Sequence, residues 1–273
     1  MQDPPFFPVI DSLSLQAQLG ENGLKLIDVR PAEAYRQAHL PGAMHFNIEQ
    51  INAKKPPVSG LLPEPAALDR LFSALGLGPT DMVVVYDEAG GPSAARLAWT
   101  LRACGHEQAA MLDAGYSGWL ATGGGTEMHV PEIRPSSYKV RLDPRRIANR
   151  DYIKTRLPEK TTVLVDARTL PEYAGTDRRT ARGGHIPGAV HFDWNDSKES
   201  ATGHFKPAAE LRLRLEALGI TPDKEVICYC QSHQRSSVLC LLLETLGYPE
   251  VKGYPGAWSD WANASDTPVE ISS

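Results

Sequence analysis

Two cysteines, a histidine and an arginine lie close together in the stretch "VICYCQSHQRSS", residues 226–237. The run that ends just before Cys230 is short, apolar and β-rich, so it predicts a buried strand. The run "VLCLLLETL" at 238–246 has the composition of a buried helix, and the glycine that follows it is a common helix terminator. A thiol therefore stands where a strand passes through a short loop into a helix.

The loop from Cys230 to Arg235 is expected to bind an anion. A helix N-terminus presents backbone N–H groups without intrahelical partners, together with the positive end of the helix dipole. Ser236 and Ser237 are candidates for the N-cap. His233 and Arg235 add positive character, and the six loop residues contain no acid. A free cysteine thiol has a pKa of about 8.5, and a helix N-terminus can lower that pKa by about one unit or more. The pattern predicts that Cys230 is a nucleophilic thiolate, or that its sulfur carries an anion.

The other three cysteines fit a structural role. Cys104 and Cys240 lie in apolar helical runs, and Cys228 lies one pleat below Cys230 on the predicted strand. Buried cysteine commonly behaves as a small hydrophobic residue. A zinc site made of Cys228, Cys230 and His233 would lack a second Cys/His cluster to complete four ligands. We therefore expect no metal.

The chain contains a long internal repeat. The segment "LIDVRPAEAYRQAHLPGAMHF" at 26–46 corresponds to "LVDARTLPEYAGTDRRTARGGHIPGAVHF" at 164–192. The segment "VVVYDEAGGPSAARLAW" at 83–99 corresponds to "VICYCQSHQRSSVLCLL" at 226–242, with an offset of 226 − 83 = 143. Solenoid repeats have periods of about 20–50 residues, so this repeat indicates a duplicated domain.

The stretch between the two copies, "TGGGTEMHVPEIRPSSYKV" at 122–140, is rich in Gly, Pro and Ser and is typical of a linker. We expect an N-terminal domain over 1–124, a linker over 125–142 and a C-terminal domain over 143–273.

Each half alternates strand-like and helix-like runs. The strand-like runs are "LKLID", "MVVVYD", "TVLVD" and "EVICYC", and the helix-like runs are "AALDRLFSALGLG" and "ELRLRLEALGI". This alternation predicts an α/β fold in which each half is a mainly parallel sheet flanked by helices. Ligands of such sheets bind at the carboxyl ends of the strands, where Cys230 is expected.

The first copy serves as an internal comparison for the loop. Asp87 aligns with Cys230, and Glu88 follows it. Two carboxylates in place of the thiol disfavour the binding of an anion, so the N-terminal domain is expected to be noncatalytic.

Composition narrows the class of protein. The 273 residues suffice for two domains, and the formal net charge of -5 gives no reason to expect nucleic acid as a partner. The N-terminus, "MQDPPFFPVI", lacks the features of a signal peptide, and no apolar run is long enough to span a bilayer. Four cysteines are too few for a disulfide scaffold. We expect a cytoplasmic protein without membrane or nucleic-acid partners.

Taken together, these residues resemble a tandem-domain rhodanese, a thiosulfate sulfurtransferase, over nearly the whole chain. The matching signatures are "DVRPAEAY" and "DARTLPEY", "HLPGAMHF" and "GGHIPGAVHF", the loop "CQSHQRS", and "GYPGAW" near the end. The loop is of the CQxHxRS type found in one bacterial subgroup. The resemblance implies two tandem rhodanese-like α/β domains, of which only the C-terminal one is catalytic, with a cysteine persulfide held by backbone amides.

The resemblance also implies the site residues. The nucleophile is Cys230, and the substrate-binding loop residues are Gln231, Ser232, His233, Gln234, Arg235 and Ser236. In the animal enzymes an arginine four residues after the "DAR" or "DSR" signature binds the substrate anion, and here Glu172 stands at that position. Arg178, Arg179 or Arg182 could replace it, and Arg182 is included among the expected substrate-binding residues.

The implied reaction is a double displacement through a persulfide on Cys230, which needs no metal or organic cofactor. The donor is thiosulfate, and the acceptor is cyanide, a dithiol or a protein thiol. The alternative donor is 3-mercaptopyruvate, although its carboxylate favours an arginine pair that Glu172 interrupts.

Two other classes remain open: a phosphatase-like enzyme and a noncatalytic sulfur carrier. The related phosphatases need Cys-x5-Arg, whereas only four residues separate Cys230 from Arg235. The retained cysteine argues against a noncatalytic module.

Overall fold

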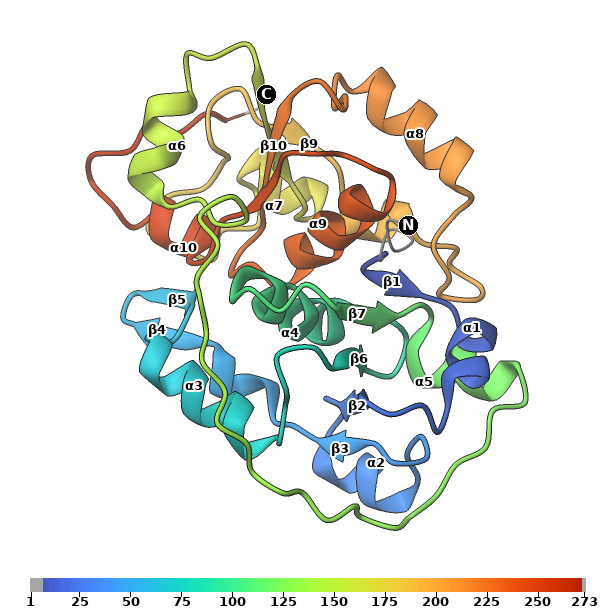
Figure 1. Ribbon diagram of the computed structural model, residues 1–273. Helices are drawn as coiled ribbons and strands as arrows, with labels where there is room; N and C mark the ends of the chain where they lie inside the picture. Colours follow the sequence, from blue (N-terminus) through green and yellow to red (C-terminus); the bar gives the residue numbers. More distant parts are fainter. Residues whose placement is uncertain (1–6, 272–273) are drawn as a thin grey trace. The chain divides into compact units, whose positions relative to one another are not determined.

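The computed structural model describes residues 7–271, which divide into two compact units (Figure 1). Unit 1 comprises the residues up to Ile48, Pro63–Leu142 and Ala201–His204, and unit 2 comprises Glu49–Leu62, Asp143–Ser200 and the residues from Phe205 onward. Each unit therefore takes a short segment from the other half of the sequence.

Unit 1 contains a five-stranded sheet with the order β1-β7-β6-β2-β3, in which every pairing is parallel. Its strands are β1 (Val9–Ile10), β2 (Leu24–Asp28), β3 (Met44–His45), β6 (Met82–Tyr86) and β7 (Ala109–Leu112). Its helices are α1 (Ser12–Gln18), α2 (Ala32–Gln37), α3 (Pro65–Ala74), α4 (Pro92–Ala103) and α5 (Gly115–Ala121). Four consecutive residues of β6 are fully buried, as expected for a parallel strand covered on both faces.

Unit 2 contains a four-stranded parallel sheet with the order β11-β10-β8-β9. Its strands are β8 (Thr162–Asp166), β9 (Val190–His191), β10 (Glu225–Tyr229) and β11 (Val251–Gly253). Its helices are α6 (Arg150–Arg156), α7 (Leu170–Ala174), α8 (Ala208–Ala217), α9 (Arg235–Thr245) and α10 (Ala257–Trp261), with 3-10 turns at Ile48–Ile51, on the boundary with unit 1, and Trp194–Ser197. The predicted α/β class, with a parallel sheet and flanking helices in each half, is confirmed.

A two-stranded antiparallel hairpin completes unit 2. It consists of β4 (Ala53–Lys55) and β5 (Val58–Leu61), which come from the N-terminal half of the chain. The backbone N–H of Ser59 donates to Ser259 Oγ at 2.9 Å, so β5 is fastened beside α10.

The internal repeat of the sequence is also visible in equivalent tyrosine–histidine contacts of the two units. In unit 1 the ring of Tyr35 stacks on His39 with centroids 4.0 Å apart, and in unit 2 Tyr173 stacks on His185 at 3.7 Å. Both histidines are buried, and Nδ1 of each lies within hydrogen-bond distance of the carbonyl of its tyrosine. The His-Leu-Pro-Gly and His-Ile-Pro-Gly signatures therefore support the fold rather than a reaction.

Residues 125–142 contain no helix and no strand. They run along unit 1, where the N–H of Ser136 donates to the carbonyl of Ser73 at 2.9 Å and the N–H of Arg141 to that of Cys104 at 3.0 Å.

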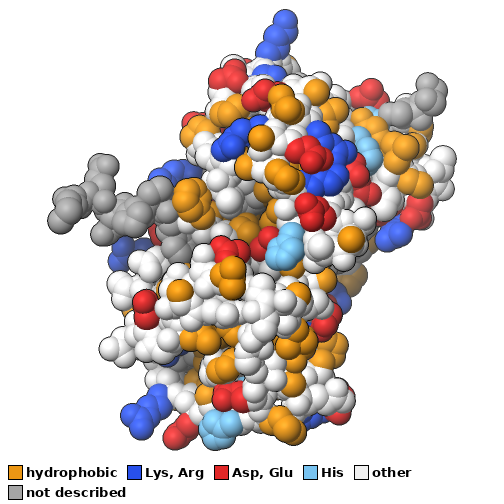
Figure 2. Space-filling model, turned by 90° about the vertical axis from the view of Figure 1, so that its right-hand side faces the viewer, with side chains coloured by type: hydrophobic (Ala, Val, Ile, Leu, Met, Phe, Trp, Pro, Cys, Tyr) orange, Lys and Arg blue, Asp and Glu red, His pale blue; other side chains and the backbone are white. Residues whose placement is uncertain are grey.

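Across residues 7–271, no helix combines the length and apolar character needed to cross a membrane. On the face drawn in Figure 2, acidic, basic and hydrophobic side chains are interspersed.

Candidate active site

Cys230 directly follows β10, at the carboxyl end of a strand that lies between β8 and β11. Its carbonyl accepts the N–H of Trp258 at 2.9 Å, and the carbonyl of Gln231 accepts the N–H of Ser259 at 3.0 Å. These two bonds hold the start of the loop against the first turn of α10. Cys230 is 1% exposed, so its thiol lies within the surrounding loop rather than on the open surface.

The helix after the loop begins earlier than the sequence predicts. Its N-cap is Gln234, not Ser236 or Ser237, and its first residue is Arg235. His233 adopts φ +58°, a left-handed conformation that turns the chain into the helix at this point. The two serines lie in the first turn: Ser236 Oγ is 2.7 Å from His233 Nδ1, and Ser237 Oγ donates to the His233 carbonyl at 2.6 Å. Both serines thus brace the turn instead of capping the helix.

The corresponding loop of unit 1 shows what this backbone can hold. Asp87 Oδ1 accepts the N–H of Gly91 at 2.8 Å and that of Ala89 at 3.3 Å, and Oδ2 accepts the N–H of Ala94 at 3.1 Å. The carboxylate at the position of Cys230 is therefore held by loop amides. Asp87 thus occupies the amides of its own loop, so they are not available to another anion.

Both loops place a left-handed residue just before the N-cap of the following helix, although the N-cap itself is extended at Gly91 and right-handed helical at Gln234. The offset of 143 places Gly90, with φ +65°, on His233, and it places the N-cap of α4 on that of α9. The amides that hold Asp87 at Ala89 and Gly91 then correspond to Ser232 and Gln234. Within residues 7–271, the backbone N–H groups of Ser232 and Gln234 have no acceptor. The loop of unit 2 therefore offers two amides where the loop of unit 1 binds a carboxylate.

An ion pair lies beside the loop that no local pattern in the sequence revealed. Arg235 donates through both terminal nitrogens to the Glu172 carboxylate, at 2.6 and 2.8 Å. Glu172 is buried and also accepts the backbone N–H and the hydroxyl of Thr169, which forms a capping box for α7. The positive charge expected from Arg235 is thus compensated by an acid 63 residues away in the chain.

The charges of this pair are strongly stabilised. Burial opposes ionisation of Glu172, but the hydrogen bonds and charge of Arg235, together with bonds from Thr169, lower its pKa to about 2. Burial would lower the pKa of Arg235, but its bonds to Glu172 and its interaction with the charge of Cys230 raise that pKa above the usual range. Arg235 therefore remains a cation that is coupled electrostatically to Cys230.

Arg182 does not reach this group. Its guanidinium donates to the carbonyls of Ala262 at 3.0 Å, Trp261 at 2.9 Å and Thr267 at 2.6 Å, and also to that of Ala264. These acceptors lie at and after the end of α10, so Arg182 fixes the C-terminal segment. This geometry does not favour the substrate-binding role expected for Arg182.

The other two arginines considered for that role are also engaged. Arg179 pairs with Asp177 at 2.8 Å and lies 3.7 Å from Glu172. Arg178 Nε donates to the carbonyl of Thr180 at 3.3 Å.

The remaining cysteines are buried, as predicted. Burial raises the pKa of Cys104 to about 12. Burial and a hydrogen bond with Cys228 raise the pKa of Cys240 well above its usual value. Among the described residues, no group of three His, Cys, Asp or Glu side chains is arranged to hold a metal ion.

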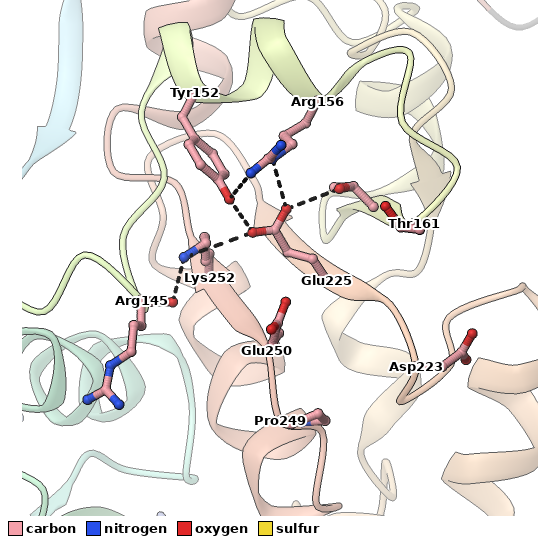
Figure 3. Close-up of a pocket in the computed structure, with 10 residues that line it drawn as sticks. Arg145, Tyr152, Arg156, Thr161, Asp223, Glu225, Pro249, Glu250 and Lys252 are labelled. Carbon is pink, nitrogen blue, oxygen red and sulfur yellow. Dashed lines mark hydrogen bonds and ion pairs between the residues drawn. The ribbon is translucent and has the colours of Figure 1, made fainter.

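A pocket of about 490 Å³ lies at the amino ends of β8, β10 and β11, away from Cys230 (Figure 3). At its base the Glu225 carboxylate accepts the hydroxyls of Tyr152 and, at 3.1 Å, of Thr162. Arg156 Nε lies 3.5 Å and Lys252 Nζ 3.9 Å from the same carboxylate. The charges of the Glu225 carboxylate and of these two cations compensate one another. Because Tyr152 and Arg156 lie in α6 and Glu225 lies in β10, the cluster links α6 to the sheet.

Comparison with known proteins agrees with this architecture. The rhodanese-like domain model matches residues 12–122 and again 149–264. A thiosulfate sulfurtransferase of Pseudomonas aeruginosa is 40% identical over 96% of this chain and 97% of its own length. A 3-mercaptopyruvate sulfurtransferase of Escherichia coli is 31% identical over 98% of this chain and 93% of its own.

A solved structure of a sulfurtransferase is also similar to this chain. The crystal structure of SseA from Escherichia coli, described as a 3-mercaptopyruvate sulfotransferase, superimposes with a TM-score of 0.82. It is 28% identical, and the match covers 92% of this chain and 99% of that one. The chain therefore belongs to the rhodanese family of sulfurtransferases, with two rhodanese domains in tandem.

Proposed function

We propose that the protein transfers the sulfane sulfur of thiosulfate to a thiophilic acceptor through a persulfide on Cys230. The observation that carries this proposal is the carboxylate of Asp87, which loop amides hold at the position equivalent to Cys230. A persulfide is also an anion, and its charge lies on the terminal sulfur, one atom beyond the cysteine Sγ. The amides of Ser232 and Gln234 are the matching donors in unit 2.

The reaction proceeds in two displacements. The Cys230 thiolate attacks the outer sulfur of thiosulfate, a new S–S bond forms, and sulfite leaves with the electron pair of the broken S–S bond. The persulfide is then stabilised by the loop amides and the N-terminal end of α9. An acceptor such as cyanide, a dithiol or a protein thiol attacks the terminal sulfur, and the thiolate of Cys230 leaves. No metal or organic cofactor enters either step.

The loop residues have distinct roles in this proposal. Ser232 and Gln234 donate backbone N–H groups, and Gln231 links the loop to α10 through its carbonyl. His233 supplies the left-handed turn, which Ser236 braces. Arg235 begins α9, and Glu172 fixes its side chain and compensates its charge.

Thiosulfate is favoured over 3-mercaptopyruvate as the donor. The mercaptopyruvate carboxylate needs free guanidinium groups, whereas Arg235 already binds a carboxylate and Arg182 binds backbone carbonyls. We expect kcat/KM for thiosulfate to exceed that for 3-mercaptopyruvate in parallel cyanide assays. A preference for mercaptopyruvate would assign the chain to the activity of the Escherichia coli relative instead.

Intact mass after incubation with thiosulfate tests the nucleophile. Transfer of one sulfur atom by covalent catalysis adds about 32 Da, and peptide mapping should place it on Cys230. Cys230→Ser should lose both the label and thiocyanate formation, because a hydroxyl is a poor nucleophile without activation. A label on Cys228 or Cys240 would refute the assignment. A reducing, cytoplasmic compartment suits this chemistry, since the thiol must stay free.

A further inference from the structure

The hairpin contributed by the N-terminal half touches the catalytic loop directly. Gly60, in β5, is buried and adopts φ +76°, a conformation that favours glycine. A Cβ placed on Gly60 would lie 2.7 Å from both the carbonyl carbon and the Cβ of Ser232, and closer still to the Ser232 oxygen. The backbone of the hairpin therefore packs on the Ser232 peptide with no room for a side chain.

A second set of contacts holds the hairpin in this place. Ser259 Oγ accepts the N–H of Ser59 and donates toward the carbonyls of Ser59 at 3.0 Å and Gly256 at 2.8 Å. The N–H of Gly256 in turn donates to the Gly60 carbonyl at 3.3 Å. Because the N–H of Ser259 also binds the Gln231 carbonyl, the segment 256–259 joins the hairpin to the start of the loop.

We propose that Gly60 is a positioning residue for sulfur transfer. Its bare backbone lets β5 lie against the carbonyl side of the peptide between Ser232 and His233. A trans peptide is planar, with its carbonyl and N–H on opposite edges, so this contact fixes the plane of the peptide that joins Ser232 to His233. It thereby fixes the path of the loop between the Ser232 and Gln234 amides. The inference rests on the proposed role of the loop as the cradle of the Cys230 persulfide.

A matched pair of variants tests the contact in the full chain. Gly60→Ala adds the colliding Cβ. Gly188→Ala is the control, because Gly188 lies in the same unit at φ +73° and a Cβ there meets nothing within 4 Å. Both substitutions impose the same left-handed strain on alanine. Only the first displaces the Ser232 peptide.

Two rates are measured on each variant: sulfur loading of Cys230 from thiosulfate, and alkylation of each cysteine by iodoacetamide with peptide mapping. A misplacement of about 1 Å can cost about 100-fold in rate, and we expect Gly60→Ala to lose at least about tenfold in sulfur loading. Alkylation of Cys230 should rise about threefold as the loop opens, since cysteine reactivity follows exposure. Cys228 and Cys240 should stay protected, which separates a displaced loop from general unfolding.

Ser259→Ala is the second variant in case Gly60→Ala fails to fold. It removes the side-chain link to Ser59 but keeps the backbone bond to Gln231, and it should shift both rates in the same directions by a smaller factor. If Gly60→Ala and Ser259→Ala match Gly188→Ala in both rates, the hairpin does not position the loop. If the wild-type chain takes no sulfur from thiosulfate, the donor proposal fails, while the alkylation rates still decide the role of Gly60.

Discussion

At the scale of single residues, the Glu172–Arg235 pair decides the charge beside Cys230. A loop arginine alone would add a free positive charge to the cradle. Its two bonds to a buried carboxylate instead hold the guanidinium in one orientation and leave the pair nearly neutral. A second cation, Arg179, lies 3.7 Å from the same carboxylate and is largely exposed, so it contributes little.

Glu172→Gln should destabilise the full chain by about 2 kcal/mol near neutral pH, because a buried, charge-assisted pair is lost while glutamine still completes the capping box. The carboxyl pKa is lower in the folded state, about 2 against an ordinary 4.5. Its stabilisation is therefore fully present above the ordinary pKa and disappears as pH falls toward the folded value. Urea unfolding at several pH values should show the difference between wild type and variant shrinking across that window.

Glu33→Gln is the control for this experiment. Glu33 pairs with Arg36 at 2.6 Å, but both side chains are more than half exposed, so its removal should leave stability nearly unchanged. A pH-independent difference between wild type and Glu172→Gln would contradict the assignment of the effect to the buried charge.

At the scale of elements, both units contain the same strand–loop–helix arrangement, with a different side chain at the first loop position of each. In unit 1 the anion is built in as Asp87, and in unit 2 the corresponding place holds the Cys230 sulfur. In both loops a left-handed residue stands at the fourth position, and in unit 1 the amides on either side of it, at Ala89 and Gly91, donate to Asp87. The copy that lacks the thiol therefore uses these loop amides to bind its own carboxylate.

Asp87→Ala should destabilise unit 1 by about 2 kcal/mol, since hydrogen bonds from backbone amides to a charged acceptor are worth about 1.5–3 kcal/mol and loop donors are left unsatisfied. Hydrogen exchange should show faster exchange at Gly91 and Ala94 than in the wild type. Glu21→Gln, at an exposed turn, is the comparison and should leave exchange unchanged. Equal protection of both amides in wild type and Asp87→Ala would show that the carboxylate does not organise the loop.

At the scale of the whole molecule, the boundary between the compact units does not follow the order of the chain. Unit 2 contains residues 49–62 in addition to the C-terminal half, and unit 1 contains residues 201–204. Unit 2 is thus incomplete in a fragment that begins after the linker, although such a fragment contains Cys230.

A fragment of residues 143–273 should transfer sulfur at least about tenfold more slowly than the full chain, because the Ser232 peptide loses its contact with Gly60 and positioning errors of this kind are costly. Cyanide-dependent thiocyanate formation at equal concentrations of Cys230 measures the loss, with circular dichroism as the check for folding. Full activity in a folded fragment would show that the C-terminal half is self-sufficient.

The sequence by itself determined the parts of this protein that depend on local pattern. Strand and helix periodicities located β2, β6, β8 and β10, since burial on both faces requires continuous apolar runs. The internal repeat revealed the duplication, and the strand–thiol–helix order placed Cys230 at the carboxyl end of a strand. The start of α9 was predicted too late, because the left-handed turn at His233 has no signature as clear as that of the glycine in the first copy.

Only the tertiary structure decided the surroundings of that thiol. Glu172 meets Arg235 across 63 residues, Gly60 meets Ser232 from the other half of the chain, and Arg182 turns to the carbonyls after α10. These contacts join segments that are distant in sequence, and hydrogen bonding and packing depend on positions in space rather than on spacing along the chain. A single sequence contains the residues for such contacts, but only folding determines which of them meet.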